Sequence, residues 1–197
     1  PIIEPYSAQG LREIFNQVLI GALMGLILQI VNAALVVGGQ AISASMGLGM
    51  ANMIDPNMGN VPVISQFLLV CSTIIFMSLG GHVLVITLLL ESFRALPIGQ
   101  MIDSQTLYAL VLQWSTMMFL GAVLLALPVM VSLLFVNIGV GVITRAAPAL
   151  NIFAVGFPAM ILAGMVLLAM AMPAIGYRIQ WLWRQSFDVV GQALGVT

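Results

Sequence analysis

Long stretches without a charged residue set the strongest limit on how this sequence can fold. Four such stretches follow one another, and they lie between positions 13 and 55, 55 and 91, 103 and 145, and 145 and 178. A membrane-spanning helix needs about 20 predominantly apolar residues, so each stretch can hold one. The sequence therefore predicts a helical membrane protein rather than a water-soluble domain.

The composition supports this prediction and excludes several classes of protein. Of the 197 residues, 62% are hydrophobic and 6% are charged, whereas a soluble domain has roughly a quarter charged residues. The net charge of −1 gives no basic surface for nucleic acid. The single cysteine, Cys71, excludes a disulfide framework and a multi-cysteine metal site. No cofactor or metal is expected.

Helices are predicted over residues 12–45, 63–93, 106–145 and 152–172, with a final amphipathic helix over 176–194. The expected fold is all-α, built from long kinked hydrophobic helices arranged as hairpins. The first and third helices approach 40 residues, roughly 60 Å at 1.5 Å each, which is twice a hydrocarbon core. Pro128 should kink the third helix. Because the chain opens at Pro1 without a methionine, further residues are expected upstream.

Two local patterns concern packing. In the amphipathic helix the apolar residues recur at helical spacing, and Gln180, Arg184 and Asp188 take the other face. The apolar face comprises Ile179, Leu182, Trp183, Phe187, Val190 and Leu194, and the proposed interface anchors are Tyr177, Trp181 and Trp183. In the first helix, the Gly21/Gly25 spacing is a pattern of close helix contacts.

Arginine placement gives an orientation. If the chain alternates sides, Arg145 falls alone on one side, and the other four arginines share the opposite side: Arg12, Arg94, Arg178 and Arg184. The positive-inside rule then places the 94–105 loop and the C-terminal helix in the cytoplasm.

Catalysis has little support in the sequence. His82 is the only histidine, and no acid stands three or four residues away from it, so a packing role is expected rather than a protonation switch. No carboxylate occupies the middle of an apolar stretch, which disfavours a proton-coupled carrier. The chain is not expected to be an enzyme.

The segment from Ser43 to Pro62 is the most unusual part of the sequence. Glycines and prolines deny it regular structure, and it is rich in methionine: Met46, Met50, Met53 and Met58. Irregular apolar backbone cannot face lipid and must be buried in protein or line a cavity. Flexible methionines suit a surface that closes yet adapts to varied partners. A pore plug is one interpretation, and a surface turn is the other.

Three ordered motifs make the sequence resemble the FliR family of flagellar type III export proteins. The first is Gly47-Leu-Gly-Met-Ala-Asn-Met-Ile-Asp55-Pro56 with Val61-Pro-Val-Ile-Ser-Gln-Phe67. The second is Gly81-His82 with Ser92-Phe93 and Leu96-Pro-Ile-Gly99. The third includes Asn137, Gly141, Arg145, Pro148, Asn151, Phe153, Gly156, Phe157 and Pro158. The resemblance spans nearly the whole chain.

The resemblance implies a non-enzymatic subunit of an export gate, with partners from the FliP, FliQ and FlhB families, unfolded flagellar proteins as cargo, and lipid around it. Residues 1–105 would be a FliP-like portion with a plug loop at 46–62, and residues 106–197 a long kinked helix with a FliQ-like hairpin and the amphipathic helix. The assembly would lie in the bacterial inner membrane within the flagellar basal body, raised toward the periplasm.

The resemblance also assigns residues to two roles. The plug residues would be Met46, Leu48, Met50, Met53, Ile54 and Met58, and the assembly residues would be Asp55, Pro56, His82, Arg145, Pro148, Asn151, Phe157 and Pro158. Family members often have phenylalanine where this chain has Met50 and Met53, so thioethers would replace an aromatic seal.

Two alternatives stay open. The first is the related gate of injectisomes, which export virulence proteins. The second, from another class, is a secondary carrier for a small solute. A carrier should purify alone, whereas a gate subunit should copurify with its partners.

Overall fold

The computed structural model describes residues 7–48, 63–97, 104–146 and 152–195. Within these ranges the chain is helical and contains no strand. The helices are α1 (Ala8–Ser45), α2 (Val63–Ser78), α3 (Gly81–Ala95), α4 (Ser104–Ala146) and α5 (Ile152–Leu194). This confirms the predicted all-α architecture of long apolar helices.

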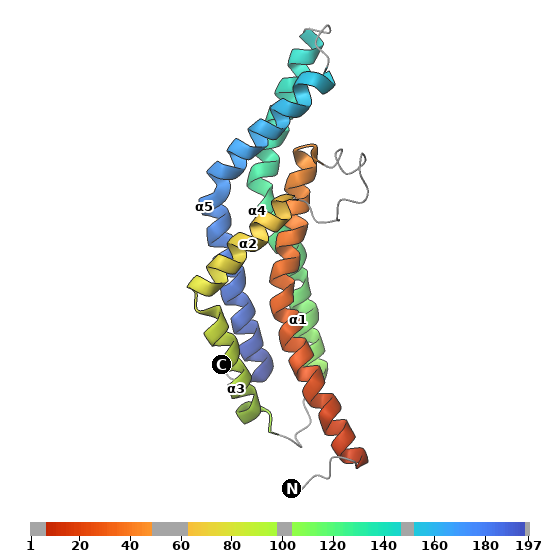
Figure 1. Ribbon diagram of the computed structural model, residues 1–197. Helices are drawn as coiled ribbons and strands as arrows, with labels where there is room; N and C mark the ends of the chain where they lie inside the picture. Colours follow the sequence, from red (N-terminus) through yellow and green to blue (C-terminus); the bar gives the residue numbers. More distant parts are fainter. Residues whose placement is uncertain (1–6, 49–62, 98–103, 147–151, 196–197) are drawn as a thin grey trace.

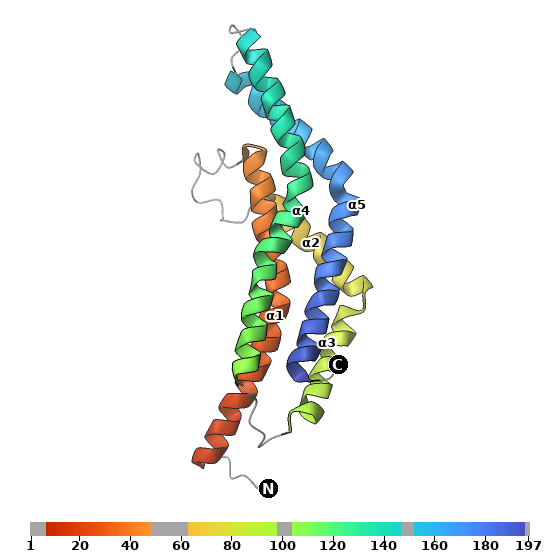
Figure 2. The ribbon, with the colours of Figure 1, turned by 180° about the vertical axis from the view of Figure 1, so that it is seen from behind.

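Three long rods define the shape of the molecule. Figures 1 and 2 show α1, α4 and α5 running side by side, with α2 crossing α1 obliquely and α3 lying along the C-terminal half of α5. The end of α4 and the beginning of α5 lie at the opposite end of the molecule from the beginning of α1 and the end of α3. By length and composition these three rods could each cross a membrane, and the α2–α3 pair could supply a fourth crossing.

The first helix begins and ends as its sequence requires. The Ser7 hydroxyl oxygen accepts a hydrogen bond from the Gly10 backbone N–H at 3.0 Å, which satisfies one of the free donors of the first turn. At the other end Gly47 has φ of +81°, a left-handed conformation that glycine adopts without strain. Together these residues limit α1 to a rod of about 57 Å at 1.5 Å per residue.

The predicted single helix over residues 63–93 is wrong, because the chain bends by 65° between α2 and α3. Gly80 adopts φ of +70° at the bend. Gly81 leaves space for the Phe76 ring, since a Cβ at position 81 would lie 2.5 Å from that ring. Two adjacent glycines therefore make the bend, one through its backbone angle and the other through its missing side chain.

The predicted break between residues 172 and 176 is also wrong. The fifth helix runs without interruption through Pro158 and Pro173. A proline removes one intrahelical hydrogen bond, and membrane helices tolerate this loss when neighbouring groups compensate. By contrast, the predicted continuity of α4 through Pro128 is confirmed, so no hairpin divides that helix.

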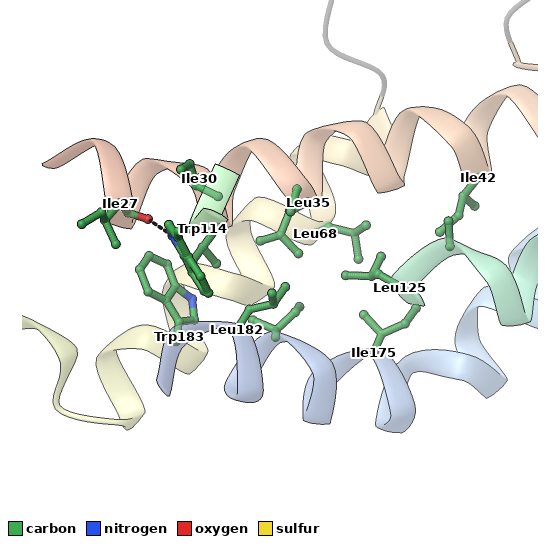
Figure 3. Close-up of a cluster of buried hydrophobic side chains, with 14 of the residues drawn as sticks. Ile27, Ile30, Leu35, Ile42, Leu68, Trp114, Leu125, Ile175, Leu182 and Trp183 are labelled. Carbon is green, nitrogen blue, oxygen red and sulfur yellow. Dashed lines mark hydrogen bonds between the residues drawn. The ribbon is translucent and has the colours of Figure 1, made fainter. Parts of the chain in front are cut away.

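The core lies where all three rods meet α2. Figure 3 shows side chains from α1, α2, α4 and α5 pointing toward one another, among them Ile27, Leu68, Leu125 and Leu182. The predicted apolar face of the C-terminal helix is confirmed, since all six of its members are buried. Trp183 is one of them, so its predicted role as an interface anchor is wrong, whereas Tyr177 and Trp181 are exposed.

Close packing of α1 depends on glycines other than the predicted pair. A Cβ added at Gly21 or Gly25 would meet nothing within 4 Å, so these two residues make no close contact within the described chain. At Gly39 a Cβ would lie 2.6 Å from the Ser65 Cα. The nearest approach of α1 and α2 is therefore made through Gly39.

Candidate functional site

The predicted plug residues are only partly described. Met46 and Leu48 lie within the described residues, whereas the other predicted residues of the segment, and two from the α4–α5 turn, lie outside them: Met50, Met53, Ile54, Asp55, Pro56, Met58, Pro148 and Asn151. The described part of the site therefore consists of the residues on either side of the 49–62 segment and of the helices that they contact.

Its first end is held on α5. Met46 is fully buried, and its backbone N–H donates to the Ile42 carbonyl oxygen at 3.0 Å. The side chain lies against Gly164, where an added Cβ would come within 2.6 Å of the Met46 Cγ. Gly164 thus provides the space that the methionine occupies.

Gly47, the next residue, lies against Phe157, one of the predicted assembly residues. A Cβ built on Gly47 would lie 3.6 Å from the ring of Phe157, which is half-buried near the beginning of α5. That distance leaves room for a Cβ, so it is the positive φ of Gly47 that favours glycine here. Phe157 and Met46 therefore lie at the same end of the segment.

The second end is held on α1. Ser65 is fully buried in the first turn of α2, and its hydroxyl donates to the Val36 carbonyl oxygen at 2.9 Å. Gly39 allows this approach, because any side chain there would overlap the Ser65 backbone. The residues on the two sides of the 49–62 segment are therefore fixed on different helices, Met46 on α5 and Ser65 on α1.

Two apolar grooves run between α1 and α4 beside this site. The groove nearest the end of α1 has a volume of about 330 Å³ and is lined by Ser45, Met130, Val131, Leu133, Leu134 and Asn137. Its neighbour, of about 290 Å³, includes Val37, Ala41, Phe119, Ala122 and Leu127. Ser45 and Asn137 supply the polar groups of the first groove, and the second is lined by apolar side chains alone.

An aromatic cluster fixes the α2–α3 bend to α5. The rings of Phe76 and Trp183 have centroids 4.6 Å apart, and Phe187 lies 6.0 Å from Phe76. The Trp183 Nε1–H donates to the Ser72 hydroxyl at 2.9 Å. Sequence reasoning missed this cluster, although the helical spacing of Ser72 with Phe76 and of Trp183 with Phe187 is a readable signal.

A second buried tryptophan joins α4 to α1. The Trp114 Nε1–H donates to the Ile27 carbonyl oxygen at 2.9 Å, as the dashed line in Figure 3 shows. Buried tryptophans usually satisfy their single donor in this way. Across the described residues, no buried side-chain nitrogen or oxygen lacks a hydrogen-bond partner.

The remaining predicted assembly residues lie on the surface and far apart. His82 is exposed at the beginning of α3, so its expected packing role within this chain is wrong. Arg145 is exposed in the last turn of α4, and Pro158 is exposed near the beginning of α5. Figure 1 places α3 and the α4–α5 turn toward opposite ends of the molecule, so these residues form no single site.

Titratable and charged side chains are sparse among the described residues. In the four described ranges, no group of three or more His, Cys, Asp or Glu side chains could hold a metal ion. The arginines are distributed along the molecule: Arg12 and Arg94 belong to the first two turns of α1 and the last turn of α3, Arg145 lies at the other end, and two more belong to the C-terminal half of α5. The described part of the site consists of long apolar helices and of Met46 and Ser65, the anchored residues on either side of the 49–62 segment.

Comparisons with known proteins place this architecture in a family. Residues 3–186 match the family described as bacterial export proteins, family 1. The flagellar biosynthetic protein FliR of Pectobacterium carotovorum is 35% identical over 96% of this chain and 73% of its own length. FliR of Escherichia coli is 34% identical over 91% of this chain and 69% of its own length.

More distant relatives carry the same name. FliR of Bacillus subtilis is 31% identical over 82% of this chain and 64% of its own length. The family match over residues 3–186 includes α1 to α4 and most of α5, and three of the described helices are long and apolar enough to span a membrane. The chain is therefore an integral membrane component of the flagellar export apparatus, and it belongs to family 1 of the bacterial export proteins, together with the FliR proteins.

Proposed function

We propose that this chain is a structural and gating subunit of the flagellar type III protein-export channel, through which unfolded flagellar proteins cross the bacterial inner membrane. The observation that carries the proposal is the match to flagellar FliR proteins over nearly the whole chain. Its relatives named here are all flagellar, which favours a flagellar gate over an injectisome gate.

Part of the exposed apolar surface extends beyond the reach of a lipid bilayer, and partner subunits would cover it. The charge-free part of α4 is about 60 Å long at 1.5 Å per residue, twice the hydrocarbon core of a bilayer. Exposed apolar side chains continue along most of it, from Leu112 to Ile143. We assign this surface to contacts with proteins of the FliP, FliQ and FlhB families, with lipid covering the remainder.

Polar amides on the same rods support protein contacts. Gln29 and Asn32 lie on the outer side of α1, where the Asn32 Nδ2 donates to the Gln29 Oε1 at 3.2 Å. Gln40, Gln113 and Asn137 are exposed on otherwise apolar helices. An amide placed against lipid tails would leave donors and acceptors without partners, whereas a neighbouring subunit can satisfy them.

The 49–62 segment would close the export path at rest. The support lies in its two ends, which are fixed through Met46 on α5 and through Ser65 on α1. A loop that closes a channel needs fixed ends, because a loop that moved as a whole would not stay in the channel. Clustered thioethers exclude hydrated ions and still part for a polypeptide.

The test of this function is complementation followed by purification. A flagellar strain lacking its own FliR regains motility when it expresses the complete protein that contains this chain, and the tagged chain copurifies with FliP-like and FliQ-like proteins. Recovery of the chain alone and monodisperse in detergent, without motility, would instead support a small-solute carrier.

Position-specific tests separate assembly from closure. Cysteines at Gln29 and Asn32, made in a Cys71→Ser background, should crosslink to FliP-like chains, and exclusive labelling by a lipid-phase reagent would count against subunit contacts. Deleting residues 49–59 should leave the complex assembled and raise its conductance in a reconstituted bilayer. An assembled deletion complex with unchanged conductance would leave the surface turn as the interpretation of this segment.

A further inference from the structure

One strip of the molecular surface is polar where its surroundings are apolar. It lies on the C-terminal half of α5 and is called here the α5 polar stripe. Its members recur at helical spacing, and all are exposed: Tyr177, Arg178, Trp181, Arg184, Asp188 and Gln192. The opposite face of the same helix half is buried in the core, so the stripe points away from this chain.

The level of the stripe along the molecule is set by a contact in the core. Leu182, between two arginines of the stripe, lies 3.1 Å from the position of a Cβ on Gly121, and the same position is 3.5 Å from the Ala34 Cβ. Gly121 is close to the middle of the charge-free stretch of α4, and Ala34 is at the middle of the charge-free stretch of α1. The stripe therefore carries its charges at the depth where the other two rods are most apolar.

The surface on either side of the stripe has the opposite character. The neighbouring helix α3 exposes Ile86, Leu90 and Phe93, and α4 exposes Leu112 and Phe119. Earlier in α5 the exposed side chains are also apolar, including Leu162, Val166 and Met170. Apart from His82, Glu91 and Arg94 on α3, the surface around the three charges suits lipid or apolar protein.

Charged side chains at such a depth have a restricted set of environments. In membrane proteins they face the interior of a bundle or a water-filled cavity, and they pair with one another. Within the described part of this chain, Arg184 and Asp188 have no ion-pair partner. Because no described residue supplies the opposite charges, a neighbouring chain can supply them.

A second copy of this chain does not fit that role. The stripe holds two arginines and one aspartate, so a second copy facing it leaves arginines without carboxylate partners whichever way it runs. Antiparallel copies would place their arginine-rich ends on opposite sides of the membrane, against the positive-inside rule. A different chain is required.

We propose that the α5 polar stripe is a docking face for one helix of a partner subunit, which runs along α5 and carries acidic residues opposite Arg178 and Arg184 and a basic residue opposite Asp188. The inference rests on the proposed function, since it assumes that the chain works in a hetero-oligomer. It adds the face that receives the partner and the charge pattern of the helix that binds there.

Cysteine accessibility tests the docking face. In a Cys71→Ser background, Arg184→Cys and Asp188→Cys are probed with a membrane-impermeant maleimide, in the assembled complex and in the purified single chain. Labelling of both positions should be at least tenfold slower in the complex. Gln9→Cys, exposed in the first turn of α1, should label at equal rates in both samples.

Two outcomes overturn the proposal. Equally fast maleimide labelling in the complex would place the stripe on water, and labelling of the complex by a lipid-phase reagent would place it on lipid. Either result leaves the proposed function standing if the complex itself has formed. Failure to recover any complex with the unsubstituted chain would instead contradict the proposed function.

Charge exchange separates a partner from a local ion pair. Arg184→Glu should lower recovery of the complex at least tenfold, whereas Arg184→Lys should retain most of it because the charge is kept. The double variant Arg184→Asp/Asp188→Arg keeps opposite charges four residues apart on one helix but reverses both charges toward a partner. It should stay as defective as Arg184→Glu, and recovery to the unsubstituted level would overturn the proposal.

Discussion

The two ends of this molecule are built on different principles. In the bundle, where α1, α2, α4 and α5 meet, side chains such as Ile27, Leu35 and Ile179 are fully buried, and both buried tryptophans donate their hydrogen bonds within the chain. In the arm, formed by α4 from Leu134 onward and by α5 up to Leu162, large apolar side chains remain exposed. Figures 1 and 2 show the arm extending beyond the end of α1.

This difference shows which contacts stabilise the bundle and which stabilise the arm. The bundle finds its packing partners in its own sequence, so substitutions there should lower the stability of the single chain. Leu134, Phe135 and Ile143 in the arm are more than half exposed, so their partners must be other subunits or lipid. Substitutions in the arm should therefore spare the single chain and affect the assembly.

A large loss of stability is expected from filling the close contact between α1 and α2 at Gly39. Gly39→Val places a branched side chain where the Ser65 Cα is 2.6 Å from the Cβ position, and backbone on both sides cannot yield easily. We expect a loss of about 3 kcal/mol in the free energy of unfolding, measured by thermal unfolding of the chain in detergent. Gly25→Val on the same helix meets open space and is the control; equal losses in the two variants would contradict the contact.

A comparable loss in the free energy of unfolding is expected when a cavity is made in the aromatic cluster of Phe76, Trp183 and Phe187. Trp183→Ala empties a buried site between α2 and α5, and removal of a large core side chain costs about 3–5 kcal/mol. Trp181 is 37% exposed only two residues earlier, so Trp181→Ala should cost far less. Tryptophan fluorescence during denaturation compares the two, and a larger loss for Trp181→Ala would show that the cluster is not the core of this end.

A smaller effect is expected from the tryptophan that joins α4 to α1. Trp114→Phe keeps most of the apolar volume and removes the donor to the Ile27 carbonyl oxygen. That carbonyl retains its helical hydrogen bond, so the loss should be about 1 kcal/mol. Unfolding in detergent measures it, and an unchanged midpoint would mean that the hydrogen bond adds nothing to the contact between these helices.

The smallest effect on the single chain is expected in the arm. Phe135 is 69% exposed, so Phe135→Ala should change the free energy of unfolding by less than about 0.5 kcal/mol while reducing recovery of the complex. Leu125→Ala, at a buried position on the same helix, is the matched control and should lower stability itself. If Phe135→Ala destabilised the single chain as strongly, the arm would not depend on outside partners.

The sequence predicts the rods well because charge is costly in an apolar environment and marks their limits. The bounds expected for the first and third helices lie within a few residues of α1 and α4. It does not predict the bend between α2 and α3, because Gly80 and Gly81 stand in an apolar run that also fits a straight helix. The φ of +70° at Gly80 and the Phe76 ring against Gly81 are properties of the packed chain.

At α5 the sequence predicts a break that the structure does not have. Pro173 suggests a break, yet the helix continues through it, because losing one backbone hydrogen bond costs less than separating two halves that pack on the same neighbours. The site is predictable only in part: of the residues named from the sequence, Phe157 lies against Gly47 and Met46 lies against Gly164. Ser65 and Gly164 have no distinguishing pattern in the sequence, since their contacts with Val36 and Met46 join helices far apart along the chain.

Native mass spectrometry of the complex, purified from membranes through a tag on this chain, tests the account most directly. The account predicts a hetero-oligomer in which this chain is bound to other export-apparatus proteins, and dissociation of that complex by substitutions in the arm but not by Gly25→Val. A single chain carrying only lipid, with motility of the strain intact, would contradict it.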